Sequence, residues 1–224
     1  MCSVSTCVVL YKKANLRLSR HMQKPSYHHG NLKAALLSVA LDHVRQYGAD
    51  KVSLRALARD LGVSQTAPYR HFADKDALLA ELAAEGFNLL AHALQPATQT
   101  AQQDPIQAME QAGVSYVNFA LTHPEHYRLM FGSAHFHEKC FPGLDRTTEQ
   151  SYDAILQIIE AGISQGVFRN TATELLALSA WSTVHGLASL LIDGLIDQSC
   201  VDDKEQLMKA IANTLMQGIL THPA

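Results

Sequence analysis

Apolar side chains recur every three or four residues through most of the chain from residue 31 onward, which is the spacing of α-helices with one buried face. The first run starts after Asn31, a residue type that caps helix amino termini, and stops at Gly48, a residue type common just past helix ends. Its apolar positions are Leu32, Leu36, Val39, Ala40, Val44 and Tyr47. The pattern predicts an amphipathic helix between Asn31 and Gly48.

Two short helices joined by a tight turn are predicted next. Ser53 is the expected N-cap of the first, which ends at Gly62 and has one apolar face made of Leu54, Leu57, Ala58 and Leu61. The second is predicted from Gln65 to about Phe72, with Ser64 as its N-cap. The three-residue turn between them contains the glycine, which permits the positive φ that a sharp turn often needs. This arrangement predicts a helix-turn-helix.

The helical pattern continues to the end of the chain. A helix capped by Asp74 is predicted to run to Pro96, and no alternating strand pattern or Asn-Gly hairpin interrupts the remainder. Further helices are predicted at about 104–122, 124–132, 145–166, 171–198 and 202–221. The expected fold class is therefore all-α, with an amino-terminal three-helix head, a helical body and about nine helices in total.

Charge divides the chain in the same way as the helical pattern. Through Gly86 there are twelve Lys or Arg and seven acids, a balance of 12 − 7 = +5, whereas the remainder carries 6 − 14 = −8. A basic first third on an acidic remainder suits a DNA-binding head on a body that does not bind DNA, because phosphate neutralisation needs positive charge only locally. Charge alone is weak support, since many solvated helices show the same balance.

Composition restricts the compartment and the chemistry. No stretch approaches the roughly 18 uninterrupted apolar residues of a membrane span, so a cytoplasmic protein without a membrane partner is expected. The cysteines show no paired spacing and are expected to be free thiols, at Cys2, Cys7, Cys140 and Cys200. Residues 1–25 are interpreted as a mobile basic arm, and Met22 is an alternative natural start.

The stretch from Ser53 to Leu79 resembles the DNA-binding signature of the TetR family of transcriptional regulators. The resemblance rests on the Gly-Val-Ser turn, on the aromatics Tyr69 and Phe72, and on the Asp-Lys-Asp-x-Leu sequence at 74–78. Pro68 departs from the apolar residue that many members have there. Because it falls in the first turn of the predicted helix, only slight distortion is expected. The resemblance implies a helix-turn-helix DNA-binding domain at 26–73.

The body resembles a TetR carboxy-terminal domain. The segment around Trp181, His185 and Gly186 looks like the Trp-x-x-x-His-Gly signature of one subgroup, and the segment 127–131 also looks like that subgroup. The resemblance implies a ligand-binding and dimerisation domain at 74–224 and a one-component repressor. Such a protein would bind a pseudo-palindromic double-stranded DNA operator as a homodimer, and a small, mostly apolar effector would release it, with no cofactor.

Specific DNA contacts follow from the predicted helix-turn-helix. Gln65, Thr66 and Ala67 open the second helix, so they are expected to face base edges in the major groove. Side chains farther along are placed for phosphate or sugar, and Lys75 begins the next helix, where its charge favours an anion. The full predicted set is Ser53, Ser64, Gln65, Thr66, Ala67, Tyr69, Arg70, His71 and Lys75. Lys24, His28 and His29 could contact the adjacent DNA backbone, and a solvated arm without DNA contacts is the alternative.

Two sets of body residues are candidates for sensing and assembly. The candidate pocket residues are Tyr116, Asn118, Tyr127, Trp181 and His185. Trp181 and His185 lie one helical turn apart and share a face, for which packing between helices is favoured over ligand contact. The last two predicted helices have more apolar positions than one protomer needs. The candidate dimer residues are Leu187, Leu191, Leu195, Ile211 and Leu215.

Other chemistries have little support. His135, His137 and Cys140 carry metal-ligating groups, but no second ligand pair at zinc-like spacing accompanies them, so an ordinary polar loop is favoured and no metal is predicted. The sequence has no Gly-x-Ser-x-Gly elbow, phosphate-binding glycine loop or His-Glu-x-x-His motif, so an enzyme is not predicted. The alternative to a repressor is a helical ligand-binding protein that has lost DNA binding.

Overall fold

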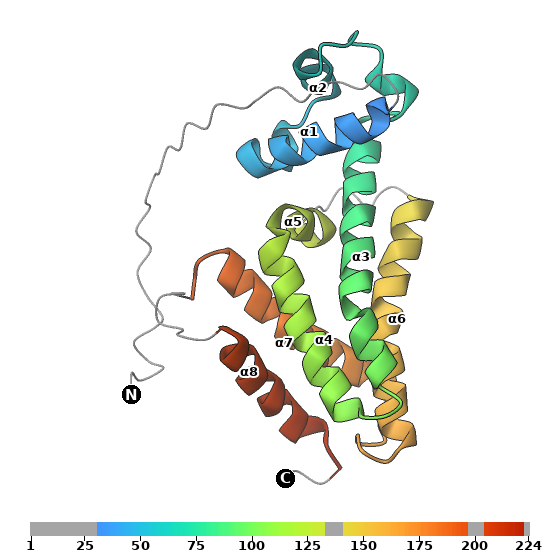
Figure 1. Ribbon diagram of the computed structural model, residues 1–224, viewed down its shortest axis with the longest axis vertical. Coiled ribbons are helices and arrows are strands. Elements are labelled where there is room, and N and C mark those ends of the chain that lie inside the picture. Colours follow the sequence, from blue (N-terminus) through green and yellow to red (C-terminus); the bar gives the residue numbers. More distant parts are fainter. Residues whose placement is uncertain (1–30, 133–140, 197–203, 222–224) are drawn as a thin grey trace. The chain divides into compact units, whose positions relative to one another are not determined.

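The computed structural model describes residues 31–132, 141–196 and 204–221, and these residues form eight α-helices, two short 3-10 helices and one isolated β-bridge. The all-α prediction is therefore confirmed (Figure 1). The chain divides into two compact units, which meet along the sequence between Leu82 and Ala83. The helix α3 (Lys75–Thr100) begins in the first unit, here called the head, and continues into the second, called the body.

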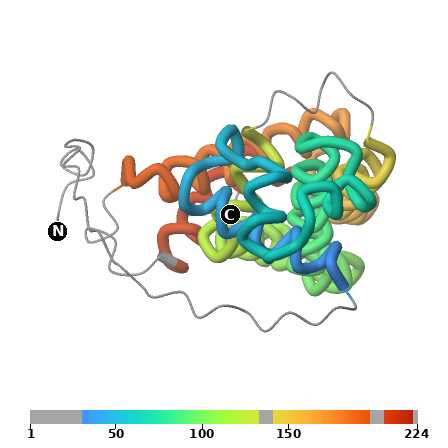
Figure 2. The backbone as a smooth tube through the Cα atoms, turned by 90° about the horizontal axis from the view of Figure 1, so that it is seen from above, coloured from blue at the N-terminus to red at the C-terminus, as the bar shows by residue number. Residues whose placement is uncertain are grey.

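The head contains α1 (Leu32–Tyr47), α2 (Leu54–Asp60), the 3-10 helices Ala49–Lys51 and Pro68–Arg70, and the first turns of α3. Figure 2 follows this path from α1 in blue to α3 in green. Asn31 caps α1 as predicted, because its side-chain oxygen accepts a hydrogen bond of 3.1 Å from the Ala34 amide. The head encloses a small core of side chains at most 4% exposed: Leu36, Ala40, Leu54, Leu57, Phe72 and Leu78.

The body consists of the rest of α3 with α4 (Pro105–Thr122), α5 (Pro124–Gly132), α6 (Pro142–Ser164), α7 (Thr173–Ile192) and α8 (Lys204–Ile219). Helix α4 is central, because it packs against α6, α7 and α8. One cluster of its core joins α4, α7 and α8 through Val117, Leu187, Leu191 and Met208. By length and composition alone, α3 and α7 would be apolar enough to cross a membrane, and α7 is the less buried of the two.

Three helices end in the same glycine motif. After α2, α6 and α7, a glycine with positive φ accepts the reversed turn that an L side chain would strain, at Gly62 (68°), Gly166 (70°) and Gly194 (67°). Beyond α7, the Leu195 amide donates to the Leu190 carbonyl at 2.9 Å, which satisfies one of the last carbonyls of the helix. The prediction that this helix runs to residue 198 was wrong, because Gly194 ends it at Ile192.

Helix α3 corrects the prediction in the other direction. It continues past Pro96 to Thr100, although the proline removes one backbone donor. The hydroxyls of Thr98 and Thr100 donate to the carbonyls of Gln95 and Pro96 at 2.8 and 3.1 Å, which helps to satisfy the backbone in this last turn. Proline was therefore a poor marker for the end of this helix.

The chain after α6 folds back against that helix. Phe168 is 1% exposed, and its ring lies so close to Gly162 that a Cβ on the glycine would overlap a ring carbon. The Arg169 amide then donates to the carbonyl of Ile219 at 2.8 Å. The Thr221 amide donates to the Val167 carbonyl at 3.2 Å, so two backbone hydrogen bonds join the chain after α6 to the end of α8, beside a ring that leaves no space for a side chain at residue 162.

Candidate functional site

The segment between α2 and α3, called the reader segment (residues 64–72), does not form the predicted α-helix. Residues 65–67 are turns and bends, and Pro68–Arg70 is a single 3-10 turn. The Ala67 amide donates to the Ser64 carbonyl at 3.0 Å, whereas Pro68 has no amide to donate. The prediction of only slight distortion was therefore wrong, since the missing donor at Pro68 is where an α-helix would continue its ladder.

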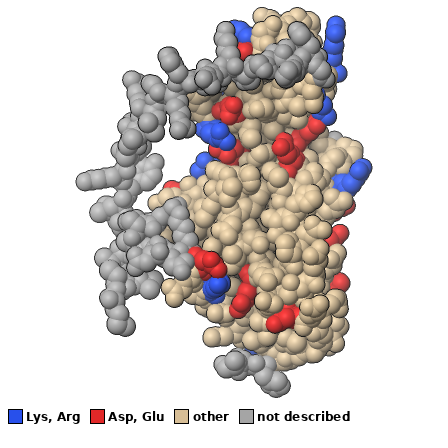
Figure 3. Space-filling view, viewed as in Figure 1, with Lys and Arg blue, Asp and Glu red and all other residues tan. Residues whose placement is uncertain are grey.

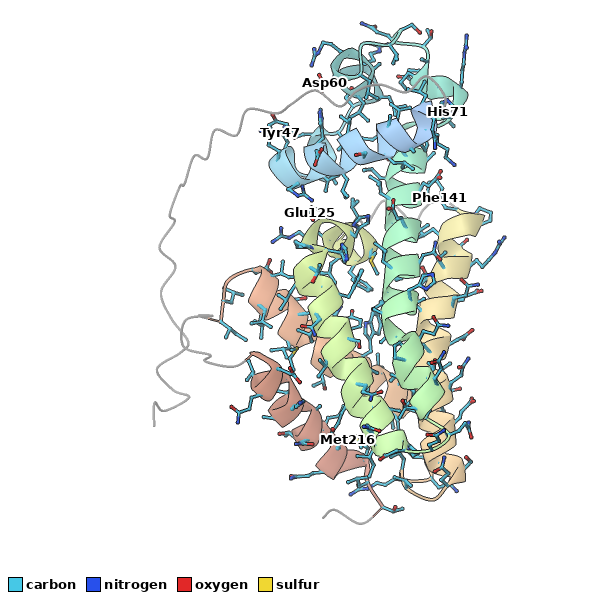
Figure 4. The ribbon with its side chains drawn as sticks, in the orientation of Figure 1. Tyr47, Asp60, His71, Glu125, Phe141 and Met216 are labelled. Carbon is cyan, nitrogen blue, oxygen red and sulfur yellow. The ribbon has the colours of Figure 1, made fainter. Side chains whose placement is uncertain are left out.

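The reader segment is nevertheless anchored on one side and open on the other. Pro68 and Phe72 are buried in the head core, whereas Tyr69 between them is 48% exposed. The remaining exposed side chains of the segment are polar: Ser64, Gln65, Thr66, Arg70 and His71. Figure 4 shows His71 at the end of this segment, just before α3. Two buried anchors thus hold a row of hydrogen-bonding groups toward solvent.

Predicted caps around the reader segment have mixed outcomes. Asp74 caps α3, because its carboxylate accepts a 2.8 Å hydrogen bond from the Ala77 amide. Ser64 does not cap an amide; its hydroxyl lies 3.2 Å from the Thr66 hydroxyl, so the prediction for its side chain was wrong. Ser53 occupies the N-cap position of α2, is exposed and makes no side-chain cap bond. Half-buried Lys75 donates to the Asp50 carbonyl at 3.4 Å.

The head also displays basic side chains near the reader segment. Lysine and arginine side chains project from the head, as Figure 3 shows in blue. The exposed basic residues of α2 and its surroundings are Lys51, Arg55, Arg59 and Arg70. Such a distribution supplies the local positive charge that phosphate binding needs.

The body contains a cavity of about 630 Å³, within the usual range for small-molecule sites. Side chains from six helices, α3 to α8, line it, and most of them are apolar. Its aromatic walls are Phe87, Tyr116, Phe131, Tyr152 and Trp181. Gly113 and small side chains of α4, α6 and α7 leave the space that these rings do not fill.

The predicted pocket residues form three groups: those that line the cavity, those that contact a lining residue and one that lies elsewhere. Tyr116 and Trp181 line the cavity. Tyr127 and His185 are not among the lining residues, but both reach Tyr116: His185 Nδ1 lies 3.0 Å from the Tyr116 hydroxyl and 2.8 Å from the Tyr127 hydroxyl. Asn118 is exposed and does not line the cavity, because it lies on another face of α4.

Hydrogen bonds connect side chains of α4 and α5 to residues of α7 beside the cavity. The indole Nε1 of Trp181 donates to the Tyr116 oxygen at 3.2 Å, and the Tyr127 hydroxyl donates to the His185 carbonyl at 3.1 Å. Burial raises the pKa of Tyr116, with a further contribution from Tyr127, and burial lowers the pKa of His185. The imidazole is therefore neutral at pH 7, and Tyr116 keeps its proton as a donor.

Sequence and structure comparisons agree on a single family. Residues 36–82 match the family model described as "Bacterial regulatory proteins, tetR family", and residues 109–215 match the model described as "Tetracyclin repressor-like, C-terminal domain". The chain belongs to the TetR family. It is a DNA-binding transcriptional regulator with a helix-turn-helix head, and it is not an enzyme.

Individual relatives place this TetR-family protein among bacterial regulators. It is 26% identical over 196 residues to the uncharacterized HTH-type transcriptional regulator YobS of Bacillus subtilis, covering 85% of this chain and 94% of that protein. A structure of a protein with unknown function from Rhodococcus sp. RHA1 has a TM-score of 0.76 and 33% identity, covering 89% of this chain and 100% of that one.

The TetR-family regulator PfmR of Thermus thermophilus supports the fold alone, with a TM-score of 0.65 and 20% identity, covering 81% of this chain and 97% of that one. None of these relatives tests the Trp-x-x-x-His-Gly subgroup, which remains a prediction.

The dimer residues predicted for this TetR-family chain differ in how much of each the protomer itself buries. Leu187 and Leu191 are 6% and 2% exposed and belong to the protomer's own core, and Ile211 packs against the same cluster. Leu215 is partly buried and lines the cavity. Leu195 is exposed, and so are three α7 leucines outside the predicted set: Leu175, Leu178 and Leu190.

Sequence reasoning missed part of the cavity that the TetR-family body contains. Asp145, Thr148, Glu149 and Tyr152 form one side of it, at spacings that bring them to one face of α6. That spacing was visible in the sequence, but helical periodicity does not separate a face that meets a cavity from one that meets solvent. Four candidate residues lie outside the described part of the chain: His135, His137, Cys140 and Cys200. Among the residues that the structure describes, no group of three or more His, Cys, Asp or Glu could hold a metal ion.

Proposed function

We propose that this TetR-family regulator is a cytoplasmic homodimeric repressor that binds a pseudo-palindromic operator and is released by a small, largely apolar molecule. The observation that carries the proposal is the presence in one chain of a solvent-facing polar reader segment, anchored by Pro68 and Phe72, and of a large cavity in the body. A helix-turn-helix dimer places two such segments about 34 Å apart, one helical turn of DNA.

The reader segment would supply the base contacts. Gln65 can bond an adenine at two points, because its amide oxygen accepts and its amide NH2 donates, and the methyl groups of Thr66 and Ala67 suit a thymine methyl. Tyr69, Arg70 and His71 are exposed beside them and would contact phosphate or sugar. Lys75 and Ser53 would contact the phosphate backbone at the starts of α3 and α2.

Helix α7 would form the centre of the dimer interface. Its exposed face carries Leu175, Leu178 and Leu190 at 56%, 52% and 43% exposure. Small residues, Ser182 and Gly186, lie between them at helical spacing, and no atom lies within 4 Å of where a Cβ of Gly186 would be. An apolar face with a small-residue centre allows two copies of α7 to pack closely about a two-fold axis.

The same helix would transmit the effector signal. Trp181 and Val184 of α7 line the cavity, whereas Leu178 and Ser182 lie on the proposed dimer face. An effector that alters the hydrogen bond between Trp181 and Tyr116 would therefore act on the helix that sets the geometry of the dimer. Release requires that the effector bind better to a state whose head spacing does not fit the operator, because only differential affinity shifts the equilibrium.

Selection of tight-binding duplexes from a random pool tests the DNA claim. Gln65→Ala should weaken binding by about 1 to 3 kcal/mol and relax preference at one or two base pairs. Lys75→Ala should weaken all sequences alike and reduce the salt slope by about one. The assignment fails if Gln65→Ala leaves the selected sequence intact while Lys75→Ala changes it.

The alternative function is a binding protein that lost its DNA contacts. The polar character of the reader segment favours the repressor, because a degenerate head has no reason to retain Gln65, Arg70 and His71 in exposed positions. If the pool yields no enriched sequence while small molecules still bind the body, the alternative is supported.

A further inference from the structure

We propose that the effector cavity takes a lipophilic organic cation, a protonated amine or quaternary ammonium group on an aromatic or aliphatic body. This inference rests on the proposed function, because it names the ligand class of the same cavity. The site is the cavity itself, about 630 Å³ between α3, α4, α5, α6, α7 and α8. The cavity walls enclose an apolar space large enough for the aromatic or aliphatic part of such a ligand. One side of the cavity carries negative charge.

All charge on the described lining is of one sign. Asp145 and Glu149 are the charged residues among the lining side chains, which include no lysine, arginine or histidine. They are four residues apart on α6 and so share one face of the helix. An anionic ligand would enter beside two carboxylates with no basic side chain on the described lining, whereas a cation would gain a favourable interaction with both.

Glu149 is exposed to solvent and also lines the cavity, at a position where the helix dipole does not favour an acid. Asp145 lies in the first turn of α6, where an acid stabilises the helix dipole without any ligand. Glu149 lies a full turn farther on, beyond the reach of that effect, and it makes no hydrogen bond or ion pair with any residue that the structure describes. Its carboxylate is therefore the stronger candidate for the ligand's counter-charge.

The aromatic walls suit the same ligand class. Phe131 stands 6.0 Å from the Trp181 ring and 5.6 Å from the Phe87 ring, each measured between centroids. The ring planes are inclined to each other by 49° and 79°, so both faces and edges of rings surround the cavity. Among aromatic side chains, tryptophan attracts a cation to its face most strongly. Tyr116 and Tyr152 add two further rings from α4 and α6. An apolar body and a positive group would both find partners here.

Isosteric probes of opposite charge test the proposal on the full-length protein without DNA. Tetraphenylphosphonium and tetraphenylborate have nearly the same shape, triphenylphosphine oxide is a neutral analogue, and benzyltributylammonium is a second cation of different shape. Trp181 is the chain's one tryptophan and lines the cavity, so its fluorescence reports occupancy directly, with calorimetry as a second readout.

The cations should bind at least about tenfold more tightly than tetraphenylborate, with the oxide between them. Glu149→Gln should weaken cation binding by about two- to fivefold, the discount reflecting its exposure. The double variant Asp145→Asn with Glu149→Gln should lose most of the preference for cations. The matched control is Glu160→Gln, an exposed α6 residue outside the lining, and it should bind as wild type does. Circular dichroism checks that each variant is folded.

Several outcomes would overturn the proposal: tetraphenylborate or the oxide binding as tightly as the cations, no change in Glu149→Gln relative to Glu160→Gln, or neither cation binding at millimolar concentration. A separate measurement of operator release distinguishes this failure from failure of the proposed function. Charge-selective binding without release keeps the ligand class and rejects the release mechanism, whereas release by neutral or anionic molecules keeps the mechanism and rejects the ligand class.

Discussion

The functional residues of the head and of the body are distributed differently along the sequence. The head places its functional groups in one contiguous stretch, residues 53–75, with two buried anchors and exposed polar groups between them. The body assembles its cavity from side chains on six helices, residues 87–215, which share no local pattern. A DNA-binding stretch that is contiguous in sequence can be found by its motif. A cavity whose residues are dispersed depends on packing that the sequence does not show.

The largest expected effect separates assembly from DNA reading. Leu178→Glu puts a charge on the exposed face of α7 and should convert the protein to monomers, because a buried unpaired charge in an apolar interface is very costly. Loss of the second head should reduce operator affinity by about 100-fold or more, although the head itself is unchanged. Sedimentation velocity and DNA titration measure the two consequences.

Two comparison variants sharpen that experiment. Ile106→Glu alters an exposed apolar residue on α4 that is not part of the proposed α7 face, and it should remain dimeric. Leu191→Glu alters a residue that is 2% exposed inside the protomer and should unfold the body rather than yield folded monomers. A dimeric Leu178→Glu would remove α7 from the interface.

A smaller effect is expected from closing the space at Gly162. Gly162→Ala places a methyl group where the Phe168 ring already lies, so it should destabilise the body by about 1 to 3 kcal/mol through overpacking. Gly132→Ala is the control, since no described atom beyond its chain neighbours and its own helix backbone lies within 4 Å of the added Cβ. Urea unfolding followed by Trp181 fluorescence reports the body specifically. Equal midpoints for the two variants would show that Phe168 can move away without cost.

The smallest expected effect concerns pH. Burial lowers the pKa of His185 below its ordinary value of 6.5, so the unfolded chain binds a proton more readily than the folded one. Stability from this group is therefore present above pH 6.5 and is lost as the pH falls below it. Wild type should lose about a few tenths of a kcal/mol more than His185→Gln between pH 7.5 and 5.5, a small difference because the ring is partly exposed. Identical pH profiles would contradict the linkage.

Local chemistry was readable from the sequence where one residue decides the backbone. Asn31, Asp74 and Gly62 mark helix ends through side-chain caps or positive φ, and each does so in the structure. Pro68 shows the limit of such reading. Its missing amide was evident, but whether one lost hydrogen bond bends an α-helix or replaces it with a 3-10 turn depends on the surrounding packing of the head.

Burial was harder to predict than helical structure. Helix α7 is apolar around most of its circumference, so periodicity could not separate Leu187, which faces the protomer's own core, from Leu178, which is 52% exposed. The same limit applies to α6, where Glu149 looks like any solvated acid until the cavity is seen. Residues whose role depends on what lies opposite them require the fold.

The most direct test of the account is hydroxyl-radical footprinting of the full-length protein on the DNA upstream of its own gene. A symmetric repressor predicts two protected segments on one face of the duplex, about 34 Å apart and related by an inverted repeat. Protection should disappear when a bound effector is present. Uniform weak protection without preferred segments, or a single segment with no symmetric partner, would contradict the claim that this TetR-family protein reads an operator as a two-fold dimer.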